Sequence, residues 1–190
     1  MTDVAPLHVW FAGGQSGAWR VERINAVAGR PLTAVNQIAV RHGQEPPLPQ
    51  GSAWALRGVT SYERYVQRAE RSALVARSPS LGRPEATHAA LIPIRKSASW
   101  WDLTQEDRRA IFEERSRHIA TGLEYLPAIA RRLYHSHELG EPFDFLTWFE
   151  YAPASTELFE ELVGKLRQTE EWAYVEREID IRLMRLDHAA

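Results

Sequence analysis

The stretch RRLYHSHELGEPFDFLTWFEY (131–151) decides the fold. Its second part, 143–151, alternates between large apolar and other side chains, which is typical of a strand with one buried face. That face carries Phe143, Phe145, Thr147, Phe149 and Tyr151. The first part, 131–139, is predicted to be a neighbouring strand, and the Gly-Glu-Pro link between the two parts favours a turn. The stretch therefore predicts two adjacent strands.

Helical patterns lie on both sides of this strand pair in the chain. A helix is predicted from about 105 to about 126, whole or in two pieces around Gly122, with Thr104 and Asp107 as its capping signal and Pro127 as its end. A second helix is expected from Ser155 or Thr156, and a last strand follows it. The helix has apolar residues at helical spacing, namely Leu158, Phe159, Leu162, Val163 and Leu166. The strand alternates the apolar residues Ile179, Ile181 and Leu183 with Asp180, Arg182 and Met184.

The first half of the chain is a weaker, strand-rich version of the second half. Strands are expected at 7–12, 17–27, 54–60 and 88–94, the stretch 33–42 is ambiguous, and the breaker-rich stretches 43–51 and 77–86 are predicted loops. Helices on one face of an antiparallel sheet make an α+β fold. Two such halves can close their sheets into a barrel, and a cavity between sheet and helices would be a natural ligand site.

Composition excludes several kinds of protein. The chain has 190 residues, a net charge of −2, no cysteine and seven tryptophans. The balanced charge argues against a nucleic-acid surface. Without cysteine there is no disulfide, no cysteine zinc site and no thiolate haem ligand, so any metal must be held by His, Asp, Glu or Tyr. The N-terminus lacks the pattern of a signal peptide and the apolar runs are too short to span a bilayer, so a soluble, cytoplasmic protein is expected.

Three histidines and one arginine are the candidates for chemistry. His135 and His137 are expected to share one face of a strand and could begin a metal site, although Glu138 would project from the opposite face. His118 lies in the predicted long helix, and Arg131 follows thirteen positions later at the start of the next strand. The two could face each other across a cavity, or each could form ordinary structural bonds.

Arg131 is expected to have apolar neighbours. Leu133 on its own strand, with Thr147 and Phe149 on the next, would form an apolar pocket around one cation. A buried, unpaired guanidinium is costly, and it persists where it stabilises an anionic ligand or a developing negative charge.

The runs IPIRKSASWWDLTQEDRR (92–109) and ARRLYHSHELGEPFDFLTWFEY (130–151), with His118 between them, resemble the chlorite dismutases. The run GVTSYERYV (58–66) is similar to the stretch before the haem edge in that family, and the resemblance covers roughly 54–178. The resemblance implies a haem b enzyme with a ferredoxin-like, dimeric α+β barrel. It also implies two lobes, a shortened N-terminal one at 1–86 and a haem-binding one at 87–190. The short members of the family are dimers, so a homodimer is expected.

The resemblance assigns roles residue by residue. The proximal haem ligand would be His118, and the carboxylate bonded to it would be Glu171, or Glu170 if the register differs by one. Arg131 would be the distal arginine. The remaining assignments are Leu133, Thr147 and Phe149 as walls of the distal pocket, Trp100 and Tyr65 at the haem propionates, and Trp101 near the proximal side and the subunit contact.

The distal residue separates the activities of this superfamily. Coproheme decarboxylases usually carry Gln at that position, and dye-decolourising peroxidases have a distal Asp in a GxxDG-type motif that this sequence lacks. Arg131 therefore favours conversion of chlorite to chloride and O2, with the guanidinium retaining hypochlorite beside the iron. A decarboxylase or peroxidase of the same superfamily, or a haem-binding barrel without activity, are the alternatives.

Overall fold

The computed structural model describes residues 7–60 and 78–186. The strands of these residues are β1 (His8–Gly14), β2 (Trp19–Ala28), β3 (Gln37–His42), β4 (Trp54–Val59), β5 (His88–Lys96), β6 (Ile129–His135), β7 (Phe145–Tyr151) and β8 (Val175–Arg185). The α-helices are α2 (Ala98–Trp101), α3 (Gln105–Arg109), α4 (His118–Glu124) and α5 (Thr156–Arg167). A π-helical turn spans Ala110–Arg115, and 3-10 turns span His137–Leu139, Pro153–Ser155 and Glu170–Tyr174.

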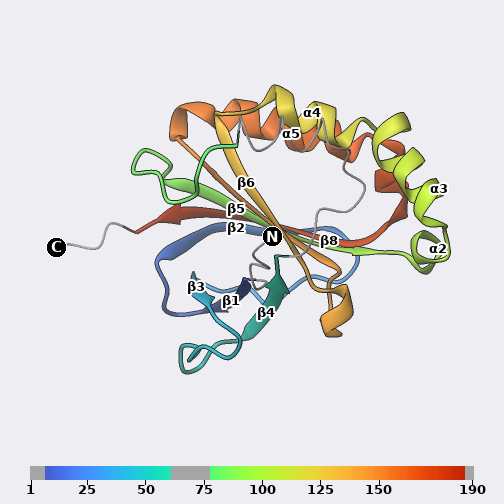
Figure 1. Ribbon diagram of the computed structural model, residues 1–190. Coiled ribbons are helices and arrows are strands. Elements are labelled where there is room, and N and C mark those ends of the chain that lie inside the picture. The colour runs from blue at the N-terminus through green and yellow to red at the C-terminus, as the bar shows by residue number, and fades with distance from the viewer. Residues whose placement is uncertain (1–6, 61–77, 187–190) are drawn as a thin grey trace, which may run out of the picture.

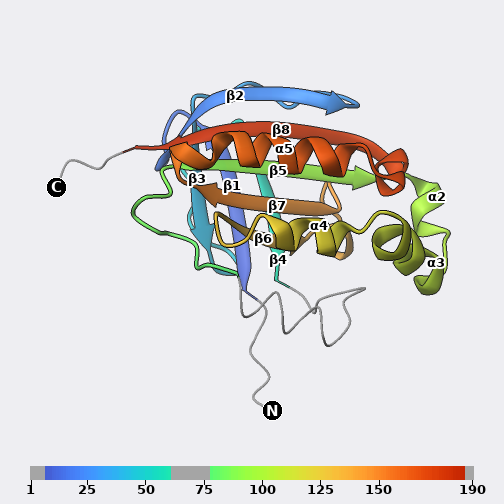
Figure 2. The ribbon, with the colours of Figure 1, turned by 90° about the horizontal axis from the view of Figure 1, so that it is seen from above.

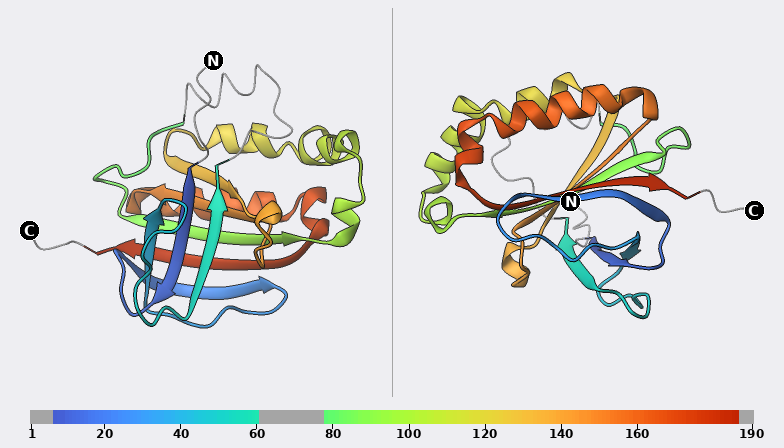
Figure 3. Two further views of the ribbon diagram at one scale, coloured as in Figure 1. Left: turned by 60° about the horizontal axis from the view of Figure 1, so that its bottom comes forward. Right: turned by 180° about the vertical axis from the view of Figure 1, so that it is seen from behind.

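The strands form a closed antiparallel barrel in the order β1-β3-β2-β8-β5-β7-β6-β4 (Figure 1). The long β2–β8 pair joins the two halves of the chain, and a short pair between Val59 and His135 closes the barrel. Helices α4 and α5 lie over one side of the barrel, beside the strands of the second half (Figure 2). The α+β barrel expected from the sequence is confirmed, with the described helices gathered on one side (Figure 3).

Two apolar clusters hold these layers together. One fills the barrel and contains Phe11, Leu91, Trp148 and Ile181, and the other lies between the sheet and the helices around Phe149. A closed barrel places alternate side chains of each strand inside and outside. The sheet therefore has apolar residues on both faces wherever the helices cover it.

The predicted alternation in the last strand is confirmed, but its polar side is buried too. Ile179, Ile181 and Leu183 point into the barrel cluster. Asp180 and Arg182 alternate with them and are also buried. These polar side chains belong to a network beneath α5 that the sequence pattern did not predict.

The predicted helix at 105–126 is broken, and the break is not at Gly122. Helix α3 begins at the expected Thr104–Asp107 capping box and continues into the π-helical turn. The chain then breaks at Arg117, whose φ of 51° is left-handed, and α4 begins at His118. Gly122 lies inside α4 and is buried. A left-handed residue that is not glycine costs free energy, so its neighbours must hold it in place.

The predicted strand at 131–139 is too long. Strand β6 ends at His135, and His137 lies in the following 3-10 turn. The backbone N–H groups of Ser136 and His137 both donate to the carbonyl of Asp144, which turns the chain away from the sheet. His135 is therefore buried while His137 is exposed, and the expectation that they share one strand face is wrong.

The ambiguous stretch is now assigned, and two smaller expectations need correction. In the ambiguous stretch 33–42, only β3 is a strand. Phe143 precedes β7 and packs in the barrel cluster, whereas Phe145, Phe149 and Tyr151 face the helices. Leu158 is exposed on the outer side of α5, whose inner side buries the other predicted apolar residues. No helix in the described part of the chain is long and apolar enough to cross a membrane.

Candidate haem-binding site

A cavity lies between the covered face of the sheet and helices α4 and α5. Its walls are Ile92, Ile94, His118, Arg131, Thr147, Phe149, Val163, Leu166, Trp172 and Glu178. Strands β5 to β8 supply one wall, and α4, α5 and the turn before β8 supply the other. The structure thus brings His118 and Arg131 to opposite walls of one cavity.

His118 is held at the start of α4 by a buried carboxylate. Its Nδ1 is 2.7 Å from Oε2 of Glu171, and its ring stacks on Phe112 with 4.4 Å between the ring centres. The N–H of Glu171 donates to Oγ of Ser116, which fixes the carboxylate beside the helix break. With Nδ1 engaged by Glu171, the ring's second nitrogen, Nε2, is left for a ligand.

Lys96 is the third member of this cluster and was not predicted from the sequence. Its Nζ donates to Oε1 of Glu171 at 2.8 Å and to the carbonyl of Glu171 at 3.2 Å, and lies over the ring of Trp100. Burial alone would raise the pKa of Glu171, but the charges and hydrogen bonds of His118 and Lys96 outweigh it and lower the pKa to about 2. Glu171 is therefore an anion across the physiological pH range.

The register between Glu170 and Glu171 is settled by this geometry. Glu170 points away from His118 and forms an ion pair with Arg115 at 3.0 Å, in which both side chains are about half exposed. Glu171 carries the bond to His118. The structure therefore pairs His118 with Glu171 and not with Glu170, and the role of this pair toward haem stays a prediction.

Arg131 projects from β6 toward α4. Its guanidinium packs against Gly122, where a Cβ atom would lie only 2.7 Å from one terminal nitrogen of Arg131. Burial lowers the pKa of Arg131, and the negative charge of Glu113 opposes this effect. Glycine at position 122 thus lets the cation approach the helix backbone. The sequence analysis had considered Gly122 only as a point where the helix could break.

The predicted neighbours of Arg131 lie on the same face of the sheet. Arg131 is directly opposite Phe149 across β6 and β7, and Leu133 is directly opposite Thr147. Thr147 and Phe149 line the cavity with Arg131. Leu133 is 45% exposed, so it lies at the rim rather than in a closed wall.

The two adjacent tryptophans have different surroundings. Trp100 is buried beside Lys96 and Tyr174, and its Nε1 is a buried donor without a hydrogen-bond partner in the described structure. Trp101 is partly exposed, stacks on His137 at 3.7 Å and donates from Nε1 to Asp144. Tyr65, the other predicted propionate residue, lies outside the described residues.

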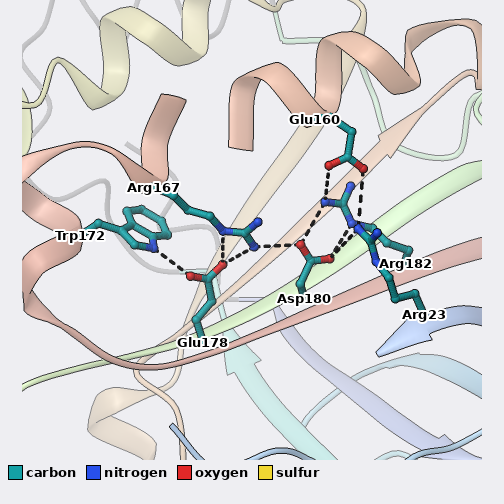
Figure 4. A network of polar contacts seen from close by, with 7 residues as sticks. All are labelled: Arg23, Glu160, Arg167, Trp172, Glu178, Asp180 and Arg182. Carbon is teal, nitrogen blue, oxygen red and sulfur yellow. Dashed lines mark hydrogen bonds and ion pairs between the residues drawn. The ribbon is translucent and has the colours of Figure 1, made fainter. Parts of the chain in front are cut away.

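A buried charge network borders the cavity at Glu178 (Figure 4). Both oxygens of this fully buried carboxylate are bonded, one to Trp172 Nε1 at 2.8 Å and the other to Arg167 Nε at 2.8 Å. Arg167 also contacts Asp180, which is bonded in turn to Arg182. Because α5 supplies Arg167 and β8 supplies the two carboxylates, the network fastens the helix to the sheet.

His135 and His137 do not combine into a metal site. His135 packs edge-on against Phe145, and His137 Nδ1 is 2.6 Å from Oδ1 of Asp144. Within the residues described, no group of three or more His, Asp or Glu side chains could hold a metal ion. A single His118 facing a cavity agrees better with a metal that brings its own equatorial ligands, as haem does.

Comparison with known proteins agrees with this arrangement. The family model described as chlorite dismutase matches residues 49–186. The chain belongs to the chlorite dismutase family. The match includes the His118 helix, the Arg131 strand and the turn that carries Glu171.

Chlorite dismutases of known structure share the fold. The dimeric chlorite dismutase of Nitrobacter winogradskyi is 57% identical and matches with a TM-score of 0.87 over 94% of this chain and 99% of that one. The Candidatus Nitrospira defluvii chlorite dismutase in complex with imidazole is 25% identical, with a TM-score of 0.68 over 95% and 92% of the two chains. The curated chlorite dismutase of Ideonella dechloratans is 32% identical over 140 residues, which are 69% of this chain and 44% of that protein.

The donor groups at this site fit a haem, but the cavity is too small to admit one without a change in its walls. His118 offers Nε2 for the iron. Trp100 is not one of the residues that line the cavity, but its Nε1 is a buried donor without a partner among the described residues, which suits a propionate. The free space is about 50 Å³, whereas ligand pockets usually measure roughly 300–1,000 Å³. Haem binding therefore requires the walls to separate, and the guanidinium of Arg131 is the group in contact with the opposite helix.

Proposed function

We propose that this protein is a haem b-dependent chlorite dismutase that converts ClO2⁻ to Cl⁻ and O2. The observation that carries the proposal is the opposition of two groups across one cavity. On the helix wall lies His118, bonded to a buried carboxylate, and on the sheet wall lies the cation of Arg131. Membership of the chlorite dismutase family supports the same reaction.

His118, Glu171 and Lys96 would form the proximal side. Haem, when bound, would supply an iron at which the two oxygen atoms of chlorite are joined into O2 while chlorine leaves as Cl⁻. His118 would hold the iron through Nε2, and Glu171 would accept the proton of Nδ1, which increases the basicity of the imidazole. Lys96 keeps Glu171 ionised.

Arg131 would form the distal side with Thr147 and Phe149. Loss of one oxygen atom from chlorite leaves hypochlorite, which must stay in the cavity until its own oxygen atom joins the first to give O2 and Cl⁻. A guanidinium holds such an anion through charge-assisted hydrogen bonds, and these are strongest where water is excluded. Phe149 lies beside Arg131 on the sheet and supplies an apolar surface that limits water there.

Trp100 and Tyr65 would contact the propionates, and Trp101 would lie near the subunit contact. The buried, unpartnered Nε1 of Trp100 supports its assignment. Trp101 is partly exposed and already bonded to Asp144, which suits a position at a surface between subunits. We propose a homodimer, because the Nitrobacter winogradskyi relative is dimeric and matches over almost its whole length. The division into lobes at residue 86 and the cytoplasmic location stay predictions.

The test combines a haem titration with an oxygen electrode. We expect the purified protein to bind haem b with a Soret band typical of histidine ligation, and to release one O2 for each chlorite added. A protein that binds no haem, or binds it and releases no O2, would contradict the proposal. Conversion of iron coproporphyrin to haem b without O2 release would instead identify a coproheme decarboxylase.

A further inference from the structure

Glu113 joins the π-helical turn to the beginning of α4. Its Oε2 accepts the backbone N–H of Ile119 at 2.6 Å, and its Oε1 accepts that of Ala120 at 3.2 Å. Its carbonyl accepts the N–H of Arg117 at 2.9 Å. One residue thus anchors both the left-handed break and the two amides that follow His118.

These bonds replace acceptors that the break removes. The first amides of a helix have no partner within that helix, and Arg117 interrupts the path from the preceding turn. A carboxylate that accepts two such amides stabilises the helix start through hydrogen bonds and through the helix dipole. His118 is the first residue of α4, so the direction of its ring depends on this anchor.

The same carboxylate and the distal cation contact the same short helix. Glu113 is bonded to the amides of Ile119 and Ala120, and Gly122 follows two positions after Ala120 on α4. Gly122 is the residue against which the guanidinium of Arg131 packs. The opposing effect of Glu113 on the pKa of Arg131 agrees with this proximity.

We propose that Glu113 is a positioning residue for both sides of the site. Its two hydrogen bonds to α4 set the orientation of His118, and its negative charge partly balances that of Arg131. The proposal rests on the proposed haem site.

Three variants separate the two roles. Glu113→Ala removes the hydrogen bonds and the charge, whereas Glu113→Gln removes the charge but keeps one oxygen that can accept an amide. Glu114→Gln is the matched control, because Glu114 is exposed on the same turn and loses the same charge. Circular dichroism verifies that each variant is folded.

Three measurements that need no turnover report on the two sides of the site. Haem affinity and the iron–histidine stretching band of the ferrous protein report on His118. The fluoride affinity of the ferric protein reports on the distal cation. Glu113→Ala is expected to weaken haem binding by about tenfold, the lower end for an outer partner of a metal ligand, and to shift the stretching band. Glu113→Gln is expected to bind haem almost normally and fluoride on the order of threefold more tightly.

The proposal is overturned if both Glu113 variants match Glu114→Gln in haem affinity, stretching band and fluoride affinity. If fluoride affinity rises equally in Glu113→Gln and Glu114→Gln, the effect belongs to the overall charge of the turn and the distal role of Glu113 is wrong. Wild-type protein that binds haem and releases O2 beside unaffected Glu113 variants would leave the proposed function intact. Wild-type protein that binds no haem would remove both.

Discussion

Replacing Glu171 with Gln should destabilise the protein at neutral pH and much less in acid. The carboxylate is buried between His118 and Lys96, and these partners lower its pKa from 4.5 to about 2. At about 1.4 kcal/mol for each pKa unit, this difference corresponds to about 3 kcal/mol of stability. Gln resembles the protonated acid, so Glu171→Gln should lower the free energy of unfolding at pH 7 by about 3 kcal/mol.

The pH dependence has a definite sign. The pKa of Glu171 is lower in the folded chain than in the unfolded one, so the unfolded chain binds the proton more readily. The contribution of Glu171 is complete above pH 4.5 and is lost as the pH falls toward 2. The difference between wild type and variant should therefore shrink over this interval.

Urea unfolding of the haem-free protein, followed by tryptophan fluorescence at pH 7, 4 and 3, measures this difference. The matched control is Glu170→Gln, because Glu170 is an exposed neighbour that pairs with Arg115 on the surface. That variant should cost less than about 1 kcal/mol. Equal costs for the two variants at pH 7, or a cost for Glu171→Gln that does not decrease in acid, would refute the reasoning.

Three other variants test the two walls of the cavity. His118→Ala should lose haem or bind it far more weakly in a Soret titration, and an unchanged histidine-type spectrum would place the ligand elsewhere. Arg131→Ala should keep haem but release hypochlorite to a chlorination probe and inactivate faster, with kcat/KM for chlorite lower by roughly tenfold to a hundredfold. Gly122→Ala should not lower the thermal midpoint, because alanine favours a helix by about 1 kcal/mol. It should nevertheless raise hypochlorite release, since the new Cβ displaces the guanidinium of Arg131; release equal to wild type would show that this contact is unimportant.

The sheet could be predicted from the sequence because strand alternation is a local signal. In a strand, alternate residues share a face regardless of the tertiary structure. This places Ile179, Ile181 and Leu183 together, and they pack inside the barrel. The buried state of Asp180 and Arg182 on the opposite face could not be predicted in this way. The burial of Asp180 and Arg182 depends on α5, an amphipathic helix that covers them and also supplies Arg167.

The helix before β6 shows a different limit. Its composition favours a helix throughout, and Gly122 was the one visible weak point. The break instead occurs at Arg117, whose N–H donates to the carbonyl of Glu113 four positions earlier. A left-handed residue other than glycine leaves no signal in the composition of a helix, because it persists only where the surrounding structure holds it.

The site residues also divide into those that the sequence could predict and those that it could not. His118, Arg131 and Glu171 could be selected because their motifs resemble a family. Lys96 was invisible, although it lies at the end of a predicted strand, because a lysine there is normally solvated. The sequence signal that could have found it is its position four residues before Trp100, the first of the two adjacent tryptophans, whose ring lies beneath its ammonium group.

The charges around the cavity explain why an anion would bind at the sheet wall. The carboxylate of Glu171, bonded to His118 of the helix wall, is neutralised by Lys96, and Glu178 on the sheet wall is neutralised by Arg167. Among the residues that the structure describes, Glu113 supplies the negative charge that opposes the effect of burial, which lowers the pKa of Arg131. An anion entering the cavity would therefore replace solvent as the partner of Arg131, and this restores the free energy that burial of the cation costs. The same imbalance predicts that the cavity should prefer small anions to neutral ligands even before the iron contributes.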